Sequence, residues 1–158
     1  MSRKKNKKIK IRKIKIEDNF NNILISKFIN LATKKGKKIK SKKMIYKSLN
    51  LIKKNYNLNP IKIFSKAIEL SSPTIEIKKK KIGGSYYKIP IKINKKRSNY
   101  IAMKWIIKNS LIRKEKNNYI GIFKEIIDTY NEISNTIKDR DKLYKNAEQN
   151  RAFTHFIF

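Results

Sequence analysis

The sequence predicts a mainly α-helical protein, a six-helix bundle with one protruding β-hairpin inserted between the third and fourth helices. Six segments place apolar residues at helical spacing. One stretch, residues 74–93, instead alternates apolar and polar residues around a pair of glycines. The length of 158 residues suits a single core. We therefore expect a basic N-terminal arm over residues 1–18 and one helical domain over residues 19–158.

Three helices are expected before the hairpin. The first should be capped by Asp18 or Asn19 and ended by Gly36 in a left-handed conformation. Its apolar stripe consists of Phe20, Ile23, Leu24, Phe28 and Leu31. The second helix should begin near Ser41, and its stripe consists of Ile45, Leu49 and Ile52. Pro60 favours the start of the third because a first-turn residue needs no amide donor, and the buried face consists of Ile61, Phe64 and Ile68.

The stretch 74–93 predicts the hairpin, with Gly83 and Gly84 between its two strands. Pro90 cannot donate a ladder hydrogen bond, so the second strand is expected at an edge. A hairpin of two strands is only marginally stable alone. We therefore expect it to project from the helical body and to be steadied by its ligand.

Three more helices are expected after the hairpin. The stripe of the fourth consists of Ile101, Ala102, Trp105, Ile106 and Ile112. The stripe of the fifth consists of Ile122, Ile126, Ile127, Tyr130 and Ile133. Asn135 and Thr136 predict a break and a cap, followed by a last helix from about Ile137 towards Arg151.

The charge of the chain indicates a polyanionic partner. Lys and Arg number 42 against 11 Asp and Glu, a net charge of +31. Residues 19–114 carry 26 basic and 2 acidic residues, whereas residues 115–158 carry 7 of each. Such self-repulsion is tolerated when a polyanion neutralises it. We expect the nucleic-acid surface in the first three quarters, while the last quarter packs or meets a less charged neighbour.

The candidate RNA contacts fall into five places along the chain. They are Lys4, Lys5 and Arg12 in the arm; Lys34, Lys35, Lys37 and Lys38 around Gly36; Lys78, Lys79, Lys80, Lys81, Gly83 and Gly84 in the hairpin; Lys96, Arg97, Lys104, Arg113 and Lys114 around the fourth helix; and Arg151 near the end. Lysine and arginine would bind phosphates, and the glycines would let the hairpin tip approach the RNA backbone. Tyr86 and Tyr87 are the best candidates for stacking on bases, because adjacent strand residues face opposite sides.

Catalysis is not expected. The chain has no Cys and one His, which excludes thiolate chemistry and a pair of histidines. It has no Walker or complete GxGxxG pattern, so we expect neither a cofactor nor a metal. No window approaches the roughly 18 apolar residues of a membrane span, and no membrane partner is expected. With these classes set aside, we expect a nucleic-acid-binding protein.

A known family shares several short strings with this sequence. They are KFIN at residues 27–30, GKK at 36–38, KKKKIGGSYYKIPIKI at 78–93, IAMKWII at 101–107 and AEQNRAFTHF at 147–156. In order and spacing they resemble the family of the seventh small-subunit ribosomal protein of bacteria and organelles, over about residues 17–155.

The resemblance implies a structural role in translation. It implies binding to the 3′ major domain of small-subunit ribosomal RNA and organisation of the subunit head. It also implies neighbouring head and platform proteins as partners, and a position near the exit-site tRNA and the exiting mRNA. The alternative, which charge alone would allow, is a basic architectural nucleic-acid-binding protein not tied to the ribosome.

Composition bears on the source. The chain has 36 Lys, 30 Ile and 18 Asn but no Val, which indicates an AT-rich genome. The MSRK start and the NRAFTHF ending look most like plastid-encoded members of the family. A plastid, non-photosynthetic ones included, is therefore the expected location, with the cytoplasm of an AT-rich bacterium as the alternative.

Overall fold

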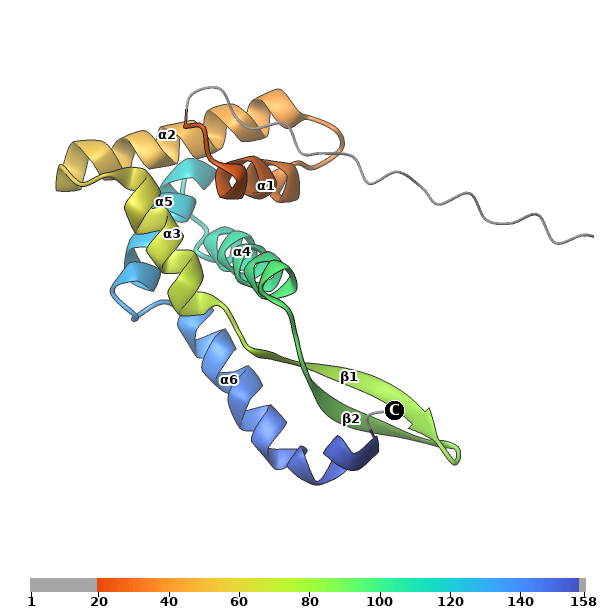
Figure 1. Cartoon of the computed structure of the whole chain (residues 1–158). Helices are drawn as coiled ribbons and strands as arrows, with labels where there is room; N and C mark the ends of the chain where they lie inside the picture. Colours follow the sequence, from red (N-terminus) through yellow and green to blue (C-terminus); the bar gives the residue numbers. More distant parts are fainter. Residues whose placement is uncertain (1–19, 157–158) are drawn as a thin grey trace, which may run out of the picture.

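The computed structural model describes residues 20–156, which form six α-helices, one antiparallel hairpin and a short 3₁₀ helix. The elements are α1 (Ile23–Ala32), α2 (Lys38–Tyr56), α3 (Pro60–Ser71), β1 (Ile75–Ile82), β2 (Ser85–Lys92), α4 (Lys95–Ile112), α5 (Asn118–Tyr130), α6 (Asn135–Gln149) and η1 (Arg151–Phe156). The first five helices gather at one end, and the hairpin and α6 extend from them side by side (Figure 1). The predicted fold class is confirmed. The arm, with Lys4, Lys5 and Arg12, lies outside the described residues, and the domain division stays a prediction.

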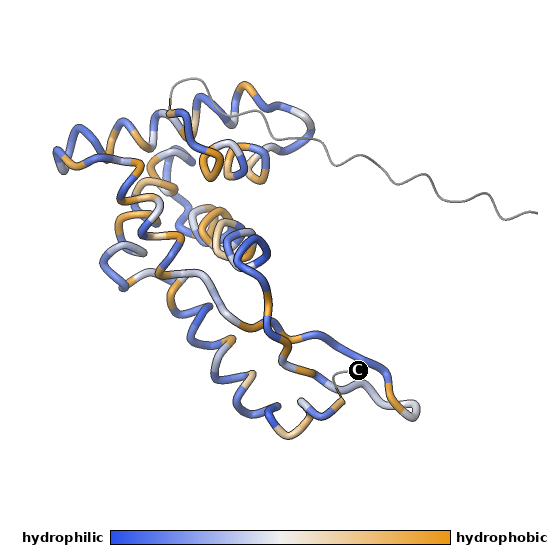
Figure 2. The backbone as a smooth tube through the Cα atoms, viewed as in Figure 1, coloured by the Kyte–Doolittle hydropathy of each residue, from blue (hydrophilic) through white to orange (hydrophobic). Residues whose placement is uncertain are grey.

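The core lies between the helices and centres on α5, which packs against α2, α3 and α4. Its fully buried side chains include Ile25, Phe28, Ile29, Ile45, Leu49, Ile52, Phe64, Ile68, Met103, Ile106 and Ile126. Phe28 and Phe64 meet edge to face with ring centroids 5.0 Å apart. Figure 2 shows hydrophobic segments where helices face one another and long hydrophilic stretches along α2 and α6. No helix in residues 20–156 combines the length and apolar character that crossing a membrane requires.

The boundaries of the first two helices differ from the prediction. α1 is capped by Asn22, whose Oδ1 accepts from the Leu24 amide at 2.7 Å, and not by Asp18 or Asn19. Phe20 precedes the helix and packs on the core beside Tyr46. α1 ends at Ala32, so Gly36, with φ of 71°, shapes the following loop and does not end the helix. α2 already begins at Lys38 because a helix start needs no apolar residue in its first turn.

The apolar stripes of α4 and α5 end earlier than predicted. Ile112, Tyr130 and Ile133 are 56%, 40% and 69% exposed, because both helices reach the surface at their last turns. α6 is capped one residue before the predicted Asn135–Thr136 break: Ser134 Oγ accepts from the Ile137 amide at 3.2 Å. Helical spacing identified the elements but not where their faces leave the core.

The hairpin turns at Gly83 and Gly84, whose φ angles of 54° and 91° suit the tight turns that glycine favours. Both the base of the hairpin and its strand β2 contact other parts of the chain. The Tyr144 hydroxyl lies 3.1 Å from the amide of Thr74, and η1 packs on β2, with Tyr87 next to Phe153 and Phe156 at centroid distances of 5.2 and 5.5 Å. The C-terminal segment therefore also supports the hairpin by covering one of its faces, in addition to the support expected from a ligand.

Candidate nucleic-acid interface

A strongly basic groove lies where α2 and α5 begin. It encloses about 1130 Å³ and has no acidic residue in its lining. Its lysines are Lys37, Lys38, Lys40, Lys43, Lys47 and Lys116. The N-caps Lys37 and Asn117 make no side-chain capping hydrogen bond, so both helices present backbone N–H groups and positive dipole ends to this region. The arrangement suits phosphate oxygens.

The loop before α2 contributes Lys37 and Lys38 to this groove, whereas Lys34 and Lys35 line a neighbouring groove of about 290 Å³. Lys34, Lys35, Lys37 and Lys38 are all exposed. Lys35 has φ of 51°, so this basic loop holds a left-handed residue beside Gly36. Ser41 Oγ donates to the Ala32 carbonyl at 3.2 Å and ties the loop to the end of α1. Sequence reasoning predicted RNA contacts in this loop but did not select Lys40, Lys43 and Lys47 of α2, or Lys116, which the packing of α2 on α5 brings to the same groove.

The hairpin carries its lysines on two different faces. Lys79 lies opposite Lys88 and Lys81 lies opposite Tyr86, so these four share one face. Like charges directly opposite each other destabilise a strand pair, and an anion bound to them would remove that cost. The other face includes Lys80, whose Nζ donates to the Phe156 carbonyl at 3.1 Å.

The two tyrosines of β2 separate accordingly. Tyr86 is 72% exposed on the lysine face and can stack on a base. Tyr87 packs against the aromatic side chains of η1 on the other face. A Cβ built on Gly83 or Gly84 would meet no atom within 4 Å, so the turn needs glycine for its backbone angles and not for space.

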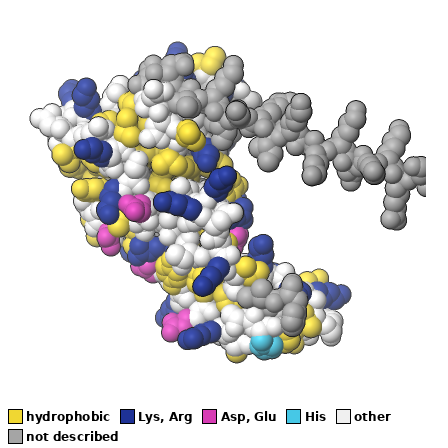
Figure 3. Space-filling view, in the orientation of Figure 1, with side chains coloured by type: hydrophobic (Ala, Val, Ile, Leu, Met, Phe, Trp, Pro, Cys, Tyr) yellow, Lys and Arg dark blue, Asp and Glu magenta, His cyan; other side chains and the backbone are white. Residues whose placement is uncertain are grey.

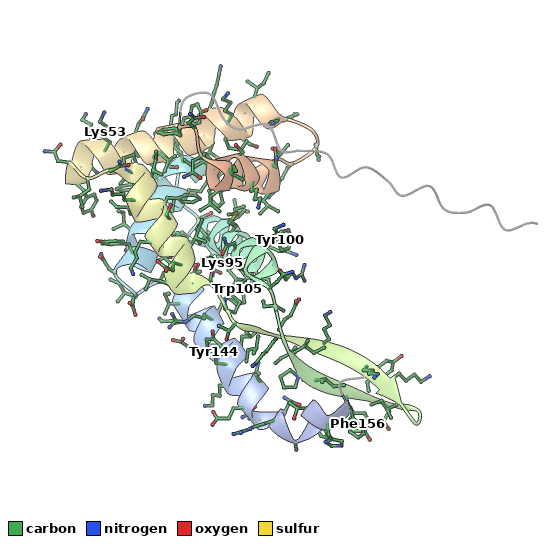
Figure 4. All side chains as sticks on the ribbon, in the orientation of Figure 1. Lys53, Lys95, Tyr100, Trp105, Tyr144 and Phe156 are labelled. Atoms are coloured by element: carbon green, nitrogen blue, oxygen red, sulfur yellow. The ribbon has the colours of Figure 1, made fainter. Side chains whose placement is uncertain are left out.

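The start of α4 joins the hairpin to the helical body. Asn94 caps the helix by accepting from the Arg97 amide at 2.9 Å. The Arg97 guanidinium donates to both carboxylate oxygens of Glu76 in β1, at 3.0 and 2.6 Å. These hydrogen bonds are the main cause that lowers the pKa of Glu76 and raises that of Arg97. Lys95 and Lys96 project beside them, and Figure 4 shows Lys95 and Tyr100 on α4.

A smaller groove between α1 and α4, of about 280 Å³, adds residues that sequence reasoning did not select. Lys27, Asn30 and Leu31 of α1 face Lys96 and Tyr100 of α4 across it. Lys27 stands alone in its sequence neighbourhood, so no local charge run could have identified it. Lys104 is exposed on α4, one turn beyond Tyr100.

Arg113 differs from the other candidates because acidic side chains hold it. Its guanidinium donates to Glu125 at 2.5 Å and to Asp128 at 2.6 Å. Burial acts to lower the pKa of Arg113, but the hydrogen bonds and charges of these two carboxylates outweigh it and raise the pKa. The structure therefore gives Arg113 a role in joining α4 to α5. Lys114 and Arg151 are exposed, and Arg151 lines a groove between the hairpin and α6.

The described residues hold no arrangement suited to catalysis. Within residues 20–156 no group of three His, Cys, Asp or Glu side chains could hold a metal ion. The ring centroids of His155 and Phe156 lie 4.0 Å apart. Asp139 accepts from Asn109 and Asp141 from Arg140, so the two carboxylates serve separate partners. The described helical body with its basic grooves is typical of a nucleic-acid-binding protein.

Comparison with known proteins makes the class specific. The family model "Ribosomal protein S7p/S5e" matches residues 2–151. The chain is 46% identical to the small ribosomal subunit protein uS7 of Carsonella ruddii (strain PV), over 87% of this chain and 88% of that protein. It is 35% identical to the uS7 protein of Pelagibacter ubique over 99% of both, and 37% identical to that of Wigglesworthia glossinidia brevipalpis over 95% and 96%.

The chain belongs to the ribosomal protein S7p/S5e family. The resemblance to this family is thereby confirmed. Its members are structural proteins and not enzymes, so the prediction that the chain is not an enzyme is confirmed as well.

Proposed function

We propose that this chain is a structural constituent of the small ribosomal subunit and binds its ribosomal RNA. The observation that carries the proposal is family membership along nearly the whole chain, together with three separate clusters of exposed lysines. Folded RNA offers closely spaced phosphates on a three-dimensional surface. The α2–α5 groove, the start of α4 and the lysine face of the hairpin would each present cations to such a surface.

In more detail, we propose binding to the 3′ major domain of the RNA and a role in organising the subunit head. The hairpin is the part suited to reach furthest, because it extends well beyond the helical body (Figure 1). It would lie near the exit-site tRNA and the exiting mRNA, while head and platform proteins would cover the less charged surfaces. The charge distribution supports this division, since residues 115–158 carry no net charge.

The test is a binding titration of the full chain with the isolated 3′ major domain across a salt series, with bulk tRNA and duplex DNA as competitors. We expect tight binding that survives both competitors near about 150 mM salt, because a rigid set of contacts reads shape as well as charge. Equal loss of binding to all three polyanions would refute the proposal and would favour an architectural nucleic-acid-binding protein.

The location of the ribosome is also a proposal. A plastid was expected from the ends of the chain, whereas the relatives named above are bacterial, which supports the alternative of an AT-rich bacterium. The genome that carries the gene decides between them: a plastid contig would support the first and a bacterial chromosome the second.

A further inference from the structure

The turn between α5 and α6 differs from the rest of the surface in charge. Residues 125–137 are the longest stretch of the chain without Lys or Arg. Of their three acidic residues, Glu125 and Asp128 pair with Arg113, and Glu132 is exposed on the turn. On the face drawn in Figure 3, several acidic side chains lie along the flank beside α5 and α6. Phosphates would find no cation on this turn. This turn therefore suits a protein partner better than it suits RNA.

The backbone of this turn leaves one apolar side chain uncovered. The amide of Glu132 donates to the Thr129 carbonyl at 3.2 Å, and that of Ile133 donates to the Asp128 carbonyl at 2.9 Å. This is the Schellman pattern, in which the residue at the place of Ile133 usually packs on its own helix. The helix residues it could meet are Asp128 and the buried Ile127, yet Ile133 remains 69% exposed. Most of this isoleucine is therefore left uncovered by the described chain.

The turn is rigid in spite of its exposure. Glu125 is fully buried and accepts from the Thr136 amide at 3.2 Å and from its hydroxyl at 2.7 Å. Thr129 and Ser134 share a hydrogen bond of 3.0 Å across the turn. Glu132 holds φ of 62°, a left-handed conformation that favours glycine. Strain of this kind persists where the surroundings impose it, and it is often found at functional surfaces.

We propose that Tyr130, Glu132 and Ile133 form a docking surface for a basic segment of a neighbouring protein. Ile133 and the exposed ring of Tyr130 would receive an apolar side chain, and Glu132 would pair with a Lys or Arg next to it. The rigid turn would require little ordering on binding. The inference rests on the proposed function, because the small subunit supplies the neighbour.

The absence of cysteine from the chain allows a direct test, since a single introduced thiol is unique. The Ile133→Cys variant would be assembled into small subunits and treated with a thiol reagent, or labelled with a benzophenone crosslinker before assembly and irradiated. The matched control is Ile39→Cys, because Ile39 is also an exposed isoleucine but lies in the lysine-lined groove.

We expect the thiol of the Ile133→Cys variant to react roughly tenfold or more slowly in the assembled subunit than in the free protein. Its crosslink should survive nuclease and carry a peptide with Lys or Arg, whereas the crosslink of the Ile39→Cys variant should be to RNA. Adding Glu132→Lys to the Ile133→Cys variant should weaken the protection of the thiol, because the new lysine would repel the basic segment of the partner. Adding Glu132→Asn instead should weaken the protection less, because Asn tolerates the left-handed backbone and carries no charge.

A crosslink from position 133 to RNA would overturn the inference, and so would a thiol that stays as reactive as in the free protein. Either result would leave assembly into the subunit and binding to ribosomal RNA intact, and so would spare the proposed function. Failure of both cysteine variants and of the unmodified chain to enter small subunits would overturn the two together.

Discussion

Replacing Lys79 and Lys88 together by glutamine should weaken RNA binding while leaving the hairpin as stable as before or more stable. The two residues are cross-strand partners on the exposed face, and no acidic residue lies opposite either of them. In the free protein their repulsion costs about 0.2–1 kcal/mol, the usual range for a cross-strand pair. In the complex each would neutralise one phosphate.

The magnitude follows from counterion release. Each lost phosphate contact reduces the slope of log K against log salt by about 0.7–0.9, so the double variant should lose about 1.4–1.8. The assay is a titration with the 3′ major domain at several salt concentrations, paired with urea unfolding of the free protein. Lys142→Gln with Lys145→Gln is the matched control, because both lysines are exposed on α6 and removing them makes the same change in charge.

Three results would refute the reasoning. An unchanged slope would mean that the lysine face of the hairpin does not contact phosphate. An equal change in the α6 control would mean that only total charge matters. Loss of stability in the Lys79 and Lys88 variant would contradict the statement that these lysines repel each other in the free protein.

Three further predictions concern stability. In a urea titration, Arg113→Ala should lower the free energy of unfolding by about 3 kcal/mol, because it leaves the buried carboxylate of Glu125 without its cation. The control Lys114→Ala, at an exposed neighbouring residue, should change the free energy of unfolding by less than about 0.5 kcal/mol. The pKa of Glu76 is lowered mainly by its hydrogen bonds from Arg97, so this pair stabilises the fold above the usual carboxyl pKa of 4.5. The contribution is lost as pH falls through the lower folded-state pKa, so the melting temperatures of wild type and Glu76→Gln should converge on acidification. A difference in melting temperature that stays constant with pH would contradict this. Gly121→Ala should destabilise by about 1–3 kcal/mol in calorimetry, because its Cβ would lie 2.6 Å from a backbone carbonyl oxygen of α4, and a neutral result would show that α4 and α5 separate freely.

Much of the fold was readable because local patterns and tertiary packing agree here. Pro60 begins α3, Gly83 and Gly84 form the hairpin turn, and the buried stripe of α2 is the predicted one. Where prediction failed, the local signal was ambiguous. Any of several Asn and Asp residues could have capped α1, and the choice of Asn22 depends on where Phe20 packs.

The candidate site was readable only in part, for a related reason. The run at residues 34–38 can be recognised from its own charge, whereas Lys27 acquires a basic setting only from Lys96, a neighbour distant in the sequence. Arg113 shows the reverse case. Its sequence neighbours suggest a phosphate contact, but α5 places two carboxylates against it.

The helical class, the inserted hairpin, the expectation of a polyanionic partner and the family could all be read from the amino-acid order, because periodicity, turn residues and net charge are properties of short segments or of the whole chain. Helix packing, in contrast, sets which lysines share a groove, which face of the hairpin stays open and which tyrosine η1 covers. It also decided that Ile133 faces outward although its spacing continues an apolar stripe. The physical reason is that exposure and electrostatic environment depend on distances between residues far apart along the chain, and these distances are set when the helices pack.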